Sequence, residues 1–135
     1  MVRIPKTIVQ EMVNHSLREA PLECCGILAG KGRTVGRIYE MRNANESRTT
    51  YLMNPKEQLV VFREMEKEGL DMVAIYHSHP HTIPFPSERD VRLAFYPDVA
   101  YIIVSLKDGN TSVKGFRIGK DAIYIEPIRV INRVT

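Results

Sequence analysis

Two histidines separated by one residue are the side chains in this sequence best suited to chemistry. His77 and His79 follow the apolar run 72–76 and are followed at once by Pro80. Side chains alternate across a strand, so both imidazoles face one side, where they can bind the same metal ion. Asp90, further along, can add a carboxylate. Three protein ligands with one position left for water are typical of a catalytic zinc site.

The segment 87–90, Ser-Glu-Arg-Asp, has a second interpretation. It is also a capping box, in which Ser87 begins a helix and Asp90 replaces the usual Glu or Gln. Both interpretations can hold together, because one helical turn can present a capping serine and a ligand carboxylate. A hydrolase also needs a general base near the attacking water. Glu88 is the local candidate, but as the residue after the capping serine it is expected to face solvent.

Periodicity and turn signals predict the elements that must position these residues. Apolar spacing predicts a first helix that opens with Pro5 and ends at Pro21. Asn54 is expected to cap a second helix, with Glu57 reaching back to the cap and Gly69 ending it. The expected strands are 22–29, 34–41, a brief one at 51–53, 72–76, 99–106, 111–118 and 122–130, and a short helix is expected from 87 to about 95.

The order of these elements favours an α/β fold in which helices flank a mixed, mainly antiparallel sheet. The run 72–76 is continuously apolar, as in a central strand buried on both faces. The three prolines of 80–86 predict a stiff loop, and Lys-Asp-Gly-Asn at 107–110 predicts a hairpin. No repeat or linker divides the chain, so residues 1–135 are expected to form a single domain.

The composition narrows the class of protein. The chain has 135 residues, of which 44% are hydrophobic and 26% charged, and a formal net charge of +3. These values suit a globular protein, and the basic residues are spread along the chain rather than gathered as in a nucleic-acid-binding block. No apolar stretch is long enough to cross a bilayer, so a membrane partner is not expected. The adjacent Cys24 and Cys25 give no disulfide framework, which favours a cytoplasmic location.

The pattern His77-x-His79-Pro80, six residues, Ser87, two residues, Asp90 resembles the signature of the JAMM (MPN+) metallopeptidases. That family places a catalytic glutamate just before a glycine-containing strand, where this chain has Glu23. The resemblance implies a cytidine-deaminase-like fold and one zinc ion held by the two histidines and the aspartate. It also implies that Glu23 takes a proton from water and passes it to the leaving amine, and that Ser87 stabilises the oxyanion.

The compact chain resembles the minimal prokaryotic type of this family. The resemblance implies an isopeptidase that cuts after the C-terminal Gly-Gly of a ubiquitin-like or sulfur-carrier protein. A non-catalytic scaffold module of the same fold is one alternative, although such modules lack metal ligands that are present here. A RadC-like DNA-repair protein is another, but it has Asn where this chain has Ser78. A zinc deaminase is excluded because its Pro-Cys-x-x-Cys signature is missing. The sequence assigns no role to His81 or to the two cysteines. It also leaves the oligomeric state open, with a homodimer as one alternative.

Overall fold

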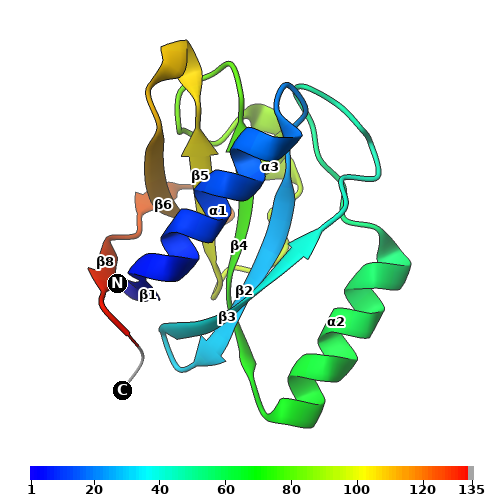
Figure 1. Ribbon diagram of the computed structural model, residues 1–135, viewed down its shortest axis with the longest axis vertical. Coiled ribbons are helices and arrows are strands. Elements are labelled where there is room, and N and C mark those ends of the chain that lie inside the picture. Colours follow the sequence, from blue (N-terminus) through cyan, green and yellow to red (C-terminus); the bar gives the residue numbers. More distant parts are fainter. Residues whose placement is uncertain (134–135) are drawn as a thin grey trace.

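Eight strands form one sheet in the order β7-β6-β5-β4-β2-β3-β1-β8. The computed structural model describes residues 1–133, and Figure 1 shows α1 lying across the sheet. The strands are β1 (Val2–Pro5), β2 (Cys25–Lys31), β3 (Thr34–Met41), β4 (Asp71–His79), β5 (Ala100–Ser105), β6 (Ser112–Ile118), β7 (Ile123–Ile125) and β8 (Ile128–Ile131). The helices are α1 (Lys6–Glu19), α2 (Pro55–Glu68) and α3 (Glu88–Arg92), with a 3-10 turn at Lys107–Gly109. Within residues 1–133, no helix is both long and apolar enough to cross a membrane.

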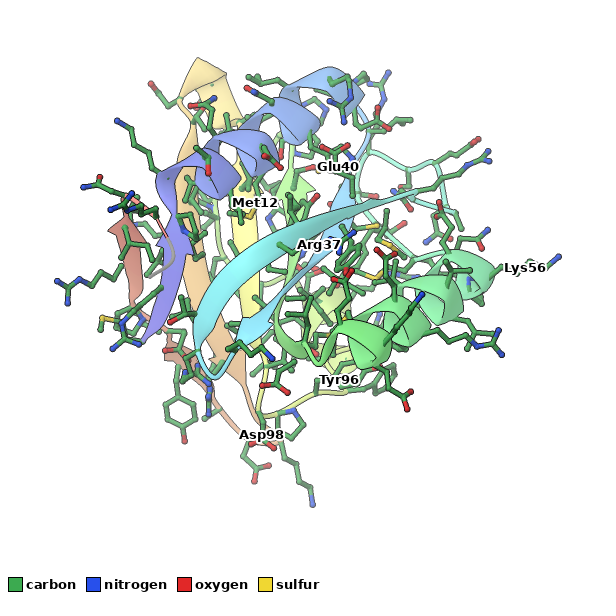
Figure 2. The ribbon with its side chains drawn as sticks, turned by 60° about the horizontal axis from the view of Figure 1, so that its bottom comes forward. Met12, Arg37, Glu40, Lys56, Tyr96 and Asp98 are labelled. Atoms are coloured by element: carbon green, nitrogen blue, oxygen red, sulfur yellow. The ribbon has the colours of Figure 1, made fainter. Side chains whose placement is uncertain are left out.

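The mixed, mainly antiparallel sheet expected from the sequence is confirmed. Four of its strand pairs are antiparallel, whereas β4–β5, β1–β3 and β1–β8 are parallel. Each face of the sheet has its own core. Ile8 and Met12 of α1 pack on one face, and Val61 and Met65 of α2 pack on the other. Figure 2 shows Met12 on the side of α1 that faces the sheet and Lys56 extending from α2 into solvent.

The central position of β4 determines where the two histidines lie. This strand pairs with β2 on one side and β5 on the other, and its residues from Val73 to His79 are all buried. The prediction of a central strand buried on both faces is therefore confirmed, although the strand is longer than the apolar run 72–76. Backbone pairing holds His77 between Cys25 of β2 and Ile103 of β5, and it holds His79 against Ser105 of β5.

Local signals predicted the ends of α2 and one hairpin correctly. The Asn54 side chain accepts hydrogen bonds from the backbone N–H groups of Lys56 and Glu57, and Gly69 ends the helix with φ 67°. Glu57 does not reach back to the cap, because its carboxylate accepts the backbone N–H of Arg42 instead. The turn at 107–110 joins β5 to β6 as expected, with positive φ at Asp108 and at the glycine after it.

Several predicted boundaries were wrong. The first helix begins at Lys6, because the preceding Pro5 has extended backbone angles and ends β1, a strand the sequence did not predict. The predicted strand 122–130 is two short strands, β7 and β8, which lie at opposite edges of the sheet. Pro127 stands between them and lacks the N–H that a continuous ladder needs. The predicted strand 51–53 is only an isolated bridge between Asn43 and Met53. The strand predicted at 22–29 lies at 25–31, and the short helix predicted to reach about residue 95 ends at Arg92.

Candidate metal centre

The side chains of His77, His79 and Asp90 meet at one point. The Nε2 atoms of the two histidines are 3.1 Å apart, and each lies 3.1 Å from Oδ2 of Asp90. Ligands about 2.0–2.1 Å from a tetrahedral zinc ion are separated by roughly 3.3 Å, so this triangle has the size that such an ion requires. Two imidazole nitrogens and one carboxylate oxygen are also a donor set that suits zinc. The three residues could therefore hold a metal ion.

The capping box at the start of α3 orients the carboxylate. Ser87 Oγ accepts the backbone N–H of Asp90 at 3.1 Å, and Asp90 Oδ2 accepts the backbone N–H of Ser87 at 2.9 Å. Burial disfavours the ionised form of Asp90, yet hydrogen bonds from the two imidazoles and from Ser87 hold its pKa well below the usual range. The carboxylate is therefore ionised at neutral pH. The capping and ligand interpretations of this segment are compatible in one geometry.

The surroundings of the two histidine rings shift their pKa values in opposite directions. His79 Nδ1 donates to the carbonyl of Ile83 at 2.9 Å, so in the neutral ring the lone pair that a metal ion needs lies on Nε2, which faces the cluster. Burial would lower the pKa of His79, but Asp90 and the Ile83 carbonyl keep it raised. Burial lowers the pKa of His77, whose ring is stacked on Tyr51 with centroids 4.5 Å apart. Nδ1 of His77 has no hydrogen-bond partner within residues 1–133.

The register of β2 against β4 brings Glu23 to the same site. Cys25 lies opposite His77, and Cys24 is bonded to Ser78, so Glu23 falls opposite His79. The Glu23 side chain is only 4% exposed, and its Oε1 atom has no hydrogen-bond partner in the described part of the chain. Burial raises the pKa of this carboxyl to about 8; of the smaller effects, His79 lowers it and Asp90 raises it further. An unpartnered buried carboxyl of this kind is typical of a functional group.

Two positioning residues were missed from the sequence. Ser78, fully buried between the two histidines, accepts the backbone N–H of Cys24 on its Oγ at 2.8 Å. Asn43 donates through Nδ2 to the carbonyl of Glu23 at 3.0 Å, while the Glu23 N–H donates to the Ser47 carbonyl. These bonds fix the backbone on both sides of the glutamate. Alternation along β4 did indicate that Ser78 points away from the histidines, but nothing in the sequence singled out Asn43.

The remaining candidate residues lie in different surroundings. Ser87 is exposed beside the cluster, and within residues 1–133 its Oγ only accepts, so its hydroxyl hydrogen is free to donate. His81 is exposed and lies outside the group of potential ligands. Cys24 and Cys25 are free buried thiols, and burial raises the pKa of Cys25 to about 12.

An apolar hollow of about 230 Å³ adjoins the cluster on the α2 face of the sheet. Tyr51, which stacks on His77, forms part of its wall, and exposed Leu52 and Phe95 lie at its rim. The full lining is Tyr51, Leu52, Met53, Gln58, Ile75, Leu93, Phe95, Tyr96 and Tyr101. Exposed apolar side chains gathered in this way are typical of a surface that binds another molecule.

Several known proteins are similar to this chain in sequence and in fold. Residues 5–118 match the family model described as prokaryotic homologs of the JAB domain. The chain is 40% identical over 129 residues to the CysO-cysteine peptidase of Mycobacterium tuberculosis, covering 93% of this chain and 88% of that protein. It is 39% identical over 114 residues to a probable TtuB-protein conjugate cleaving protease of Thermus thermophilus, covering 84% of this chain and 73% of the relative.

Solved structures agree with this assignment. A protein of Desulfitobacterium hafniense superimposes with a TM-score of 0.91 at 36% identity, covering 99% of this chain and 95% of the other. A JAB1/MPN domain protein of Archaeoglobus fulgidus superimposes with a TM-score of 0.66 at 18% identity, covering 96% and 97% of the two chains, and shows the shared fold. This chain belongs to the prokaryotic homologues of the JAB domain, the minimal prokaryotic type of the JAMM (MPN+) family.

Proposed function

We propose that this chain is a zinc-dependent peptidase that hydrolyses a peptide or isopeptide bond after the C-terminal tail of a ubiquitin-like or sulfur-carrier protein. One zinc ion per chain would be held by His77, His79 and Asp90. The observation that carries this proposal is a buried, unpartnered carboxyl, Glu23, close to three side chains that could together hold a metal ion. A scaffold module has no need for such an arrangement, because a buried carboxyl without a partner destabilises the fold.

In this proposal the protein supplies a base, an oxyanion donor and a fixed geometry. When bound, zinc acidifies water, polarises the scissile carbonyl, and lowers the pKa of nearby Glu23 by its positive charge. Glu23 accepts the proton of the attacking water and delivers it to the leaving amine. The Ser87 hydroxyl donates a hydrogen bond to the developing oxyanion. Ser78 and Asn43 hold the backbone of Glu23 in register with the histidines.

The substrate class follows from the relatives and from the surface beside the site. The mycobacterial relative is named for a CysO-cysteine substrate and the Thermus relative for TtuB-protein conjugates. We propose a substrate of the same kind for this chain, with part of the carrier protein packing in the apolar hollow around Tyr51. A cytoplasmic location belongs to the same proposal, since both cysteines are free thiols buried in the core.

Incubation of zinc-loaded protein with ubiquitin-like proteins extended after Gly-Gly tests the proposal. Mass spectrometry should show release of the extension at the Gly-Gly bond. A metal chelator should stop the release, and added zinc should restore it. Cleavage that persists in full after the metal has been removed and its absence verified would contradict the proposed mechanism.

A further inference from the structure

A basic groove lies at the end of the sheet opposite the metal centre. It includes a cavity of about 870 Å³ next to Gly30, which pairs with Asp71, the first residue of β4. His77 lies six residues further along that strand, so about 20 Å of strand separates the groove from the cluster. The groove is therefore distinct from the proposed catalytic site.

The groove exists because β3 and β1 diverge. β3 pairs with β2 along its whole length, but on its other edge it meets β1 only at Thr34. Beyond that bridge the edge is left without a strand partner in residues 1–133. A second hollow of about 450 Å³ shares Gly36, Arg37 and Arg133 with the first, so the groove continues along this edge to Ile38. Gly36 has no side chain and is exposed, which leaves the backbone of β3 accessible there.

Positive charge is concentrated in the walls. The cavity lining includes five cationic side chains and one carboxylate, so its net charge of +4 exceeds the +3 of the whole chain. The lone carboxylate, Glu68, already pairs with Arg37, which also pairs with Glu64. The other four cationic side chains pair with no carboxylate in the described part of the chain: Arg3, Lys31, Arg129 and Arg133.

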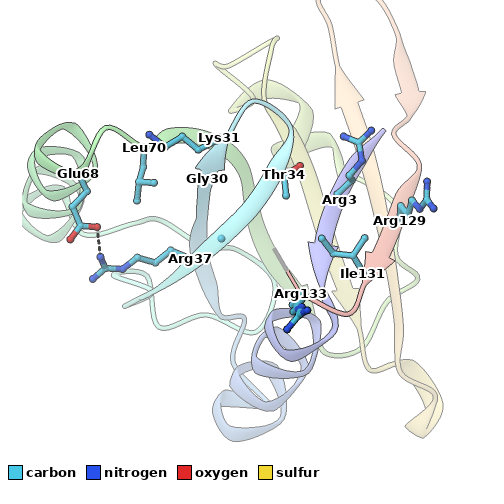
Figure 3. A pocket seen from close by; sticks show the side chains of 11 residues that line it. Arg3, Gly30, Lys31, Thr34, Arg37, Glu68, Leu70, Arg129, Ile131 and Arg133 are labelled. Atoms are coloured by element: carbon cyan, nitrogen blue, oxygen red, sulfur yellow. Dashed lines mark hydrogen bonds and ion pairs between the residues drawn. The ribbon is translucent and has the colours of Figure 1, made fainter. Parts of the chain in front are cut away.

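The arrangement of these cations favours an extended ligand over a compact anion. Arg3 and Arg129 are direct neighbours in the parallel β1–β8 pair, whereas Lys31 stands at the far side, with Nζ donating to the Gly69 carbonyl. Figure 3 shows the charged side chains distributed around the groove rather than converging on one point. Ile131 and Leu70 add apolar surface between them. A single phosphate could engage only part of this set, and a nucleic-acid duplex is too wide to enter a cavity of this size.

We propose that this basic groove binds an acidic, extended segment of a protein partner. Guanidinium groups bind carboxylates through paired hydrogen bonds, and the open edge of β3 can pair with the backbone of an added strand. Apolar side chains of the segment would pack on Ile131 and Leu70. The inference is independent of the hydrolytic activity, because none of these residues belongs to the metal centre.

A synthetic peptide of about eight residues that alternates glutamate and valine, blocked at both ends, is a suitable probe. Fluorescence anisotropy should show saturable binding that weakens between roughly 50 and 300 mM salt. The same peptide with glutamine in place of glutamate should not bind. Arg3→Gln/Arg129→Gln should weaken binding about tenfold or more. Lys56→Gln/Arg63→Gln removes the same charge from the exposed surface of α2 and should change binding less than about twofold.

Arg133→Gln, at an exposed position, provides a second groove variant, and both groove variants should keep the wild-type melting temperature. Equal loss of binding in the α2 control would contradict the proposal, because it would show unspecific attraction between opposite charges. If inorganic tripolyphosphate or a single-stranded oligonucleotide binds through the same arginines more tightly than the peptide does, the proposal is contradicted, because the groove would then be a site for phosphate groups. Cleavage of a Gly-Gly-extended carrier by the groove variants is measured in parallel, so failure of this inference is distinguished from failure of the peptidase proposal.

Discussion

Ser78→Ala should damage the site without removing any metal ligand. The substitution removes the Oγ atom that accepts the Cys24 backbone N–H, in a position with no exposure to solvent. A buried N–H left unpaired costs about 1–3 kcal/mol, which for a chain of this size lowers the melting temperature by roughly 3–10 °C. The loss also frees the backbone next to Glu23, and misplacement of a catalytic group by about 1 Å can cost a factor of about 100 in rate.

Ser16→Ala is the matched control. Ser16 is equally buried, but its Oγ donates to the Met12 carbonyl of its own helix and reaches only the Sγ atom of Cys24, at 3.5 Å, and not the backbone N–H that Ser78 holds. Calorimetry, zinc content and the rate of carrier cleavage are measured for both variants. We expect Ser78→Ala to keep its zinc, melt earlier and cleave at least about tenfold more slowly, while Ser16→Ala stays near wild type. Equal rates in the two variants would refute the positioning role of Ser78.

Three further predictions concern charge and reactivity. Asp90→Ala should reduce the zinc bound after dialysis to well under one ion per chain, as measured by atomic emission, because two imidazoles alone bind weakly. In metal-free protein the pKa of Glu23 is raised from 4.5 to about 8 on folding, so its contribution to stability is full below pH 4.5 and is lost as pH rises through about 8. Urea midpoints at pH 6 and pH 9 should therefore differ more in wild type than in Glu23→Gln, and equal differences would contradict this. Cys25, with a pKa of about 12, should resist thiol reagents at pH 8 until urea unfolds the chain, so rapid labelling of the native protein would show that the thiol is accessible.

Features set by nearby residues could be predicted from the sequence. The cap at Asn54, the stop at Gly69 and the hairpin turn at 107–110 each depend on a few neighbouring residues, and the structure confirms them. The cluster of His77, His79 and Asp90 could be predicted for a related reason. Strand alternation places His77 and His79 on one face, and the capping box that follows fixes Asp90. Placing Glu23 at the same site requires the pairing of β2 with β4, two segments that are distant in the sequence. The family resemblance implied this placement, whereas periodicity alone could not predict it.

Pairings between distant segments could not be predicted. β1 has only four residues, too few to show an alternation, and it was not predicted. Most of β8 lies within the predicted strand 122–130, but its pairing with β1, near the other end of the sequence, could not be predicted. Pro127 was a signal that the run 122–130 cannot be one continuous strand. The concentration of basic charge in the groove is a further consequence of pairing between distant segments. Arg3 and Arg129 are remote in sequence, and only the parallel contact of their strands makes them neighbours.

Cleavage by the Glu23→Gln variant, measured together with its zinc content, tests the central claim most directly. Glutamine keeps the size of the side chain but cannot accept and transfer the proton. We expect about one zinc ion per chain and a cleavage rate at least about 100-fold below that of wild type, the usual contribution of a general base. A variant that binds zinc fully and cleaves the carrier at the wild-type rate would show that Glu23 is not the base.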